Sequence, residues 1–85
     1  DTWVSMGEEE GKEAKRQKFD GFTVDDAMTD AAGPASIFMH CLPAYRGFEV
    51  TASVIDGPRS VVFQQGHNRM HAARGALAFL MGVET

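Results

Sequence analysis

The chain has 85 residues, which is enough for one small domain at most. Its net charge of −4 excludes the basic surface that nucleic-acid binding requires, and its single cysteine excludes an internal disulfide framework and a multi-cysteine zinc site. Its hydrophobic content of 44% is that of a globular protein, and its longest uncharged apolar run, residues 75–83, is too short to span a bilayer.

The N-terminal part predicts a strand end followed by a polar helix. Trp3 and Val4 favour extended structure, and Gly7 favours a turn. Residues 8–18 predict a helix that is polar on every side, with acidic residues first and basic residues last, as a helix dipole favours. Because it has little apolar surface to bury, we interpret this helix either as a solvated surface helix or as a lid that closes over a site.

The middle of the chain predicts alternating helices and strands. A helix is expected at residues 23–31, capped by Thr23 and ended by a Gly-Pro pair. The apolar run 36–42 is typical of a strand buried on both faces. A second helix, at residues 48–56, ends at another Gly-Pro pair, and residues 60–63 predict a second short strand.

The last element is a helix expected at residues 68–82. It is apolar nearly all round towards its end, which predicts cover on more than one side. The order of strands and helices indicates βαβ units. The predicted fold class is therefore α/β, with a partial parallel sheet.

Candidate functional residues follow from this topology. Ligands of open parallel sheets bind beyond the carboxyl ends of the strands. Residues 1–7, 40–43 and 64–69 lie at such ends, so we expect them to converge on one edge of the sheet. Their polar and reactive side chains make the candidate site, namely Asp1, Ser5, Cys41 and Arg69.

Cys41, the only thiol, has two interpretations. Free cysteine is most often a small buried hydrophobe, but a position at a strand end before a proline favours function. His40 is expected to point to the opposite face, so we interpret it as a packed, hydrogen-bonded residue or as an organiser of the loop, and not as a base for Cys41. Arg69, expected near the first turn of the last helix, suits a phosphate or carboxylate, or else pairs with a surface acid.

A metal site is not predicted. His67 and His71 lie four residues apart on the last helix, a spacing that can hold a metal ion. Typical zinc sites take three or four protein ligands, and no third ligand stands at helical spacing from this pair.

Three motifs, DTWVSMG, HCLPAYRG and HNRMHA, resemble in order and separation the C-terminal part of the ornithine carbamoyltransferases. The resemblance implies that residues 1–85 are the C-terminal segment of a Rossmann-like, three-layer αβα ornithine-binding domain. It implies transfer of a carbamoyl group from carbamoyl phosphate to the side-chain amine of L-ornithine, giving L-citrulline and phosphate, without cofactor or metal. It further implies a homotrimer in arginine biosynthesis, located in the cytoplasm or an organellar matrix.

The resemblance also assigns individual residues. Those expected to bind ornithine are Asp1, Ser5 and Met6. Those expected at carbamoyl phosphate are Cys41, Leu42 and Arg69, and Cys41 is the catalytic residue that assists or holds the reacting amine. The resemblance implies a cis Leu42-Pro43 bond, whereas the base rate for X-Pro bonds predicts trans. It makes the polar segment after SMG a loop that closes over ornithine.

The chain also departs from the family pattern. His67 stands where an acidic residue is usual, and Phe48 stands where an acidic or polar residue is common. The chain begins inside a motif and has neither a serine-threonine-arginine phosphate loop nor an HPxQ segment. We therefore expect a fragment that is inactive alone, whose helix 68–82 packs on an absent N-terminal domain. The alternatives are a non-catalytic ornithine-binding or assembly module, and a carbamoyltransferase for another amine.

Overall fold

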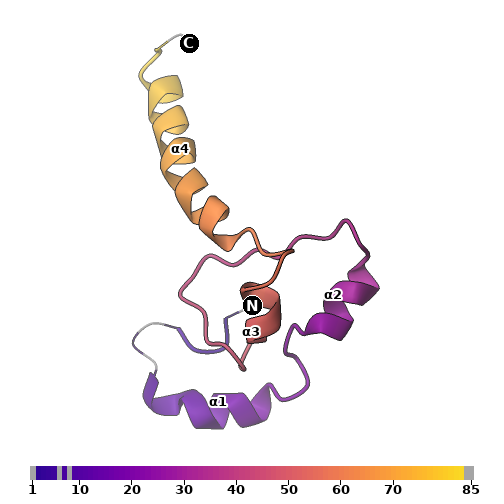
Figure 1. Ribbon diagram of the computed structural model, residues 1–85. Coiled ribbons are helices and arrows are strands. Elements are labelled where there is room, and N and C mark those ends of the chain that lie inside the picture. The colour runs from indigo at the N-terminus through magenta and orange to yellow at the C-terminus, as the bar shows by residue number, and fades with distance from the viewer. Residues whose placement is uncertain (1, 6, 8, 84–85) are drawn as a thin grey trace.

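The computed structural model describes residues 2–5, 7 and 9–83. Within these residues a short 3-10 helix, η1 (Glu9–Gly11), leads into α1 (Lys12–Lys18), and three further α-helices follow. These are α2 (Asp26–Ala32), α3 (Ala52–Ile55) and α4 (Val62–Leu80). Figure 1 shows that α4 projects as a single rod, while the other helices and the long loops gather near its N-terminal end. No helix in the described part of the chain is long and apolar enough to cross a membrane.

The predicted sheet is reduced to isolated parallel bridges in the described residues. Val24 pairs with Val50, and Phe38 pairs with Ser60. The Phe38 N–H donates to Arg59 O at 2.8 Å, and the Val61 N–H donates to Phe38 O at 3.0 Å. The segments predicted as neighbouring strands, 36–42 and 60–63, therefore pair in parallel, but the pairing is limited to a single bridge. The prediction of strands at 36–42 and 60–63 is wrong here, because two short segments without further strands beside them do not extend a ladder.

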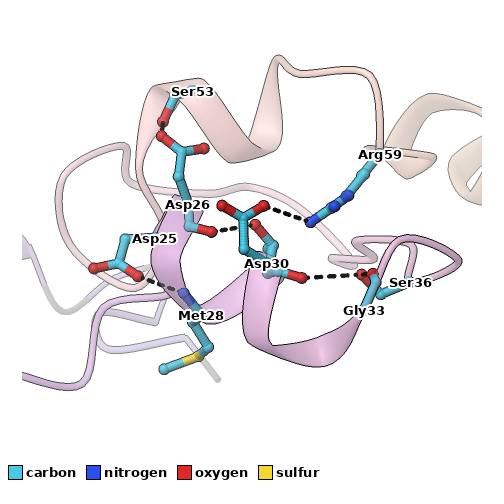
Figure 2. Close-up of polar contacts among 9 residues, drawn as sticks. Asp25, Asp26, Met28, Asp30, Gly33, Ser36, Ser53 and Arg59 are labelled. Carbon is cyan, nitrogen blue, oxygen red and sulfur yellow. Dashed lines mark hydrogen bonds and ion pairs between the residues drawn. The ribbon is translucent and has the colours of Figure 1, made fainter.

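Helix boundaries also differ from those predicted. The cap of α2 is Asp25, whose carboxylate accepts a hydrogen bond from the Met28 N–H at 2.9 Å (Figure 2). Thr23 is not the cap; its hydroxyl donates to Phe48 O at 2.6 Å. Val24 is extended in its bridge to Val50, so the helix can begin only after it. The same pairing explains why the predicted helix 48–56 shrinks to α3.

The last helix begins at Val62, six residues before the predicted start. The predicted turn at residues 64–66 is therefore wrong, because these residues lie inside α4. Val62 is only 2% exposed, and its burial against the core stabilises the first turn. Of the predicted helix at residues 8–18, residues 9–11 form the 3-10 helix η1 and residues 12–18 form α1, while Glu8 lies outside the described residues. No residue of α1 is buried.

The core is small and lies where α3 and the first turn of α4 meet the bridges. Its buried residues are Val50, Val54, Ile55 and Val62. The half-buried apolar residues that pack against them are Val24, Phe38, Leu42 and Ala44. Trp3 and Val4 are also buried. The Trp3 ring stacks on Phe19 with centroids 5.6 Å apart and lies 5.9 Å from the Phe48 ring.

Polar contacts attach α2 to α3 and to the loop that follows it (Figure 2). The Ser53 hydroxyl donates to an Asp26 carboxylate oxygen at 2.8 Å. Arg59 donates to Asp30 at 3.3 Å. These contacts are exposed, so they orient α2 and add little stability.

Shortening Val50 tests the core. Val50 is 0% exposed, so Val50→Ala should lower the free energy of unfolding by about 2–3 kcal/mol, through lost burial and a residual cavity. The measurement is urea unfolding followed by circular dichroism. Val83, which is 57% exposed, supplies the control, because Val83→Ala should change stability by less than about 0.5 kcal/mol. Equal losses for the two variants would contradict this core assignment.

Arg46 and Asp56 form a bidentate ion pair on the surface. The Arg46 Nε–H and one terminal N–H donate to the two Asp56 carboxylate oxygens, both at 2.8 Å. These hydrogen bonds, and then the opposite charge, lower the pKa of Asp56 and raise the pKa of Arg46.

The lowered pKa of Asp56 gives this pair a defined pH dependence. A carboxylate whose pKa is lower in the folded state stabilises the protein above its unfolded pKa of about 3.9, and this contribution disappears as the pH falls through the folded value. The urea midpoint of the wild type should exceed that of Asp56→Asn at pH 6, and the difference should shrink between about pH 4 and pH 2. A difference that grows on acidification would contradict this sign.

Candidate active site

The loop at residues 40–43 has a special backbone conformation. The Leu42-Pro43 bond is cis, as the family resemblance implies and contrary to the base rate. Leu42 has a φ of 57°, in the left-handed region that costs a non-glycine residue about 1–3 kcal/mol. Such a conformation persists only where the surroundings fix it.

His40 fixes this loop from within. The Leu42 N–H donates to His40 Nδ1 at 2.8 Å, so that nitrogen carries no proton. The neutral imidazole therefore bears its proton on Nε2, which lies 3.0 Å from Glu49 Oε1. This geometry confirms that His40 is a packed, hydrogen-bonded residue, and its contact with the Leu42 N–H agrees with the alternative of a loop organiser.

Glu49 is the partner that sequence reasoning missed. Its side chain is 4% exposed, and Oε1 accepts from the Tyr45 N–H at 3.0 Å as well as from His40. The other oxygen, Oε2, is buried and has no hydrogen-bond partner among the described residues. The sequence signal that could have revealed Glu49 was an acidic residue placed directly before Val50, in a segment whose apolar residues recur at helical spacing.

Gln65 connects the loop to α4 and was also missed. Its Oε1 accepts from the His40 N–H at 2.9 Å, although the two residues are 25 positions apart. Gln65 was expected in a turn, but it lies inside α4 and reaches the loop from there. Two of the three predicted segments, 40–43 and 64–69, are thereby brought together.

Cys41 lies at the surface of this arrangement. It is exposed, so it is not the buried hydrophobe of the alternative interpretation. It borders a hollow of about 160 Å³ together with five neighbours, which are Val24, Phe38, Met39, His40 and Glu49. The thiol is therefore accessible to a ligand while the adjacent backbone is held from inside.

Arg69 is placed differently from the expectation. It is the eighth residue of α4, so the argument from a helix N-terminus is wrong for it. It lies four residues after Gln65, however, and residues at this spacing share a helix face. Since Gln65 contacts the loop at residues 40–43, Arg69 stands one turn further along that same side. Arg69 is exposed and makes no ion pair with another described residue.

The N-terminal candidates are only partly visible. Asp1 and Met6 lie outside the described residues, and Ser5 is exposed. Trp3 attaches this segment to Phe48, the residue before Glu49. The segment that carries Ser5 therefore contacts the residue that directly precedes Glu49, the partner of His40.

A family model described as "Aspartate/ornithine carbamoyltransferase, Asp/Orn binding domain" matches residues 1–80. The chain belongs to this family. The aspartate/ornithine carbamoyltransferases are α/β proteins, which supports the predicted fold class at that level. The finer arrangement of layers is not formed in the described residues, which contain helices and bridges only.

Relatives within this family are close in sequence. The chain is 52% identical over 81 residues to the ornithine carbamoyltransferase of Acidothermus cellulolyticus, covering 95% of this chain and 26% of that protein. It is 56% identical over 81 residues to the catabolic ornithine carbamoyltransferase of Halobacterium salinarum, covering 95% and 28%. The chain thus spans about a quarter of the length of these curated relatives.

Solved structures of this family superpose well on the chain. The Pyrococcus furiosus ornithine carbamoyltransferase matches 99% of this chain and 27% of its own, with a TM-score of 0.82 and 48% identity. The anabolic ornithine carbamoyltransferase of Campylobacter jejuni covers 98% and 27%, with a TM-score of 0.82 and 40% identity.

Proposed function

We propose that this chain forms the ornithine side of an ornithine carbamoyltransferase active site. The complete enzyme that contains it transfers the carbamoyl group of carbamoyl phosphate to the side-chain amine of L-ornithine, giving L-citrulline and phosphate. One observation carries this proposal: the family match spans residues 1–80, and the relatives about 50% identical are named ornithine carbamoyltransferases. The fixed loop at residues 40–43 adds support, because it presents an accessible thiol beside a hollow.

The proposed reaction is a direct displacement. The neutral amine nitrogen of ornithine attacks the carbamoyl carbon, the bond from that carbon to the phosphate oxygen breaks, and the amine proton leaves with the phosphate. Cys41 holds or assists the amine, and no covalent intermediate forms on its sulfur. Arg69 stabilises charge on the departing phosphate as a fork of N–H donors. No metal or organic cofactor enters this scheme.

The other assigned residues act on binding in this proposal. Asp1 and Ser5 hold the α-ammonium group of ornithine, and Met6 contacts its aliphatic stem. Leu42 belongs to the carbamoyl phosphate site. The polar segment that follows SMG and ends with α1 closes over the bound ornithine. No residue of α1 is buried, and weakly packed elements of this kind can serve as lids.

The apolar side of α4 is proposed to pack on the remaining part of the enzyme. Its last two turns expose large apolar side chains, with Phe79 82% and Leu80 78% exposed. Apolar surface of this kind is usually covered by another part of an assembly. About three quarters of the length of the relatives lies outside the match, and this part would supply that cover.

We further propose that the complete enzyme is a homotrimer of arginine metabolism, located in the cytoplasm or an organellar matrix.

A hybrid enzyme tests the proposed function. In it, residues 1–80 of this chain replace the matching segment of the Pyrococcus furiosus ornithine carbamoyltransferase; we call this protein the hybrid enzyme. It should form citrulline from ornithine and carbamoyl phosphate, whereas the 85-residue chain alone should form none.

Two other outcomes of this test would favour the alternatives. A folded hybrid that binds ornithine in calorimetry without forming citrulline would favour a non-catalytic module. Turnover with aspartate or putrescine in place of ornithine would favour another amine substrate.

A further inference from the structure

Two exposed imidazoles on α4 lie in an arrangement that the proposed reaction does not use. His67 and His71 are one turn apart, and their Nε2 atoms are 3.1 Å from each other. Their ring centroids are 4.7 Å apart, with the rings nearly perpendicular at 81°. Both residues are exposed. They belong to α4, which projects away from the other helices (Figure 1).

This distance suits two ligands of one metal ion. Imidazole nitrogens bind zinc-like ions at about 2.0–2.1 Å. Two nitrogens 3.1 Å apart would then subtend an angle of about 95–102° at the ion, between the octahedral and tetrahedral values. We propose that His67 and His71 chelate one transition-metal dication through their Nε2 atoms, with water in the remaining coordination positions.

The space around the pair and the chemistry of its two ligands both bear on metal binding. Gly75, one turn after His71, has no side chain, and a Cβ built there would meet nothing within 4 Å. The described residues contain no group of three or more His, Cys, Asp or Glu side chains that could hold a metal, so in this proposal the described part of the chain supplies two ligands and water supplies the others. Imidazole ligands favour Cu²⁺ over Ni²⁺ and Zn²⁺, and they disfavour Mg²⁺ and Ca²⁺, which prefer oxygen.

The competing explanation is a simple hydrogen bond between the rings. An N–H of one imidazole donating to the other would give the same separation. The two explanations differ in the effect of added metal. A chelate needs both imidazoles, at this spacing, and loses most of its affinity when either is removed.

The test is equilibrium dialysis of the 85-residue chain against Ni²⁺, Zn²⁺ or Cu²⁺ near pH 7.5. All proteins carry Cys41→Ser, which removes the only thiol as a competing ligand. We expect one ion per chain, with Cu²⁺ the tightest, and no binding of Mg²⁺. His67→Gln and His71→Gln should each weaken binding by tenfold or more.

A spacing variant serves as the matched control. The double change His71→Ala and Ala72→His keeps two imidazoles but sets them five residues apart, on different sides of α4. It should bind as weakly as the single variants. Each protein is also made with Gly75→Ala, which favours helix, and helicity is checked by circular dichroism. Absence of binding, or equal affinity in the parent, single and spacing proteins, would overturn the proposal and leave the hydrogen bond.

Discussion

Replacing Arg69 with glutamine in the hybrid enzyme is expected to lower kcat/KM for carbamoyl phosphate by about 10²–10³-fold. In the proposed reaction the guanidinium supplies a positive charge and a fork of donors to the departing phosphate, and the amide of glutamine supplies neither the charge nor the fork. Arg69 shares a face of α4 with Gln65, which holds the loop carrying Cys41, so its side chain is on the correct side for this role. The measurement is steady-state kinetics with carbamoyl phosphate varied at saturating ornithine.

Arg74 provides a matched control on the same helix. It is also an exposed arginine of α4, but it lies nine residues after Gln65 and therefore on the opposite face. Arg74→Gln should leave kcat/KM within about twofold of the hybrid enzyme, as surface changes away from a site do. Equal effects of the two substitutions would remove Arg69 from the carbamoyl phosphate site.

Replacing Glu49 with alanine is expected to have the largest effect on stability, about 3 kcal/mol in the free energy of unfolding. The change leaves the Tyr45 N–H and the His40 Nε2–H buried without their acceptor. It also releases the imidazole that fixes Leu42. In the hybrid enzyme, kcat should fall together with stability, because the loop at residues 40–43 loses its fixed position. Urea unfolding and steady-state kinetics are the two measurements.

Two further substitutions show whether hydrogen bonding is the cause. Glu49→Gln keeps an oxygen that can accept both hydrogen bonds, so it should lose only about 1 kcal/mol. Glu13→Ala removes an exposed carboxylate of α1 and should change stability by less than about 0.5 kcal/mol. If Glu49→Gln and Glu49→Ala were equally destabilised, the loss would reflect the charge and not the accepted hydrogen bonds.

Several features of this protein follow from local sequence. The polar segment forms α1, and the chain stops α2 at Gly33, because charge order and backbone freedom act within a few residues. The motifs around Cys41 and Arg69 identified the family, which the match to residues 1–80 confirms.

Other features depended on contacts between distant residues. The sequence pattern predicted strands where the chain forms single bridges, since a ladder needs neighbouring strands that periodicity cannot supply. The start of α4 was predicted too late. The burial of Val62 and the hydrogen bond from the His40 N–H to the Gln65 side chain both depend on residues far away in the sequence.

Sequence by itself therefore determined the family, the polarity of α1 and the identity of the candidate residues Cys41 and Arg69. Only the tertiary structure decided that Glu49 and Gln65 hold the loop at residues 40–43. The physical reason is the distance along the sequence over which each interaction acts. Propensity, capping and turn chemistry act over a few residues, whereas burial, tautomer and rotamer are set by partners that the fold brings together.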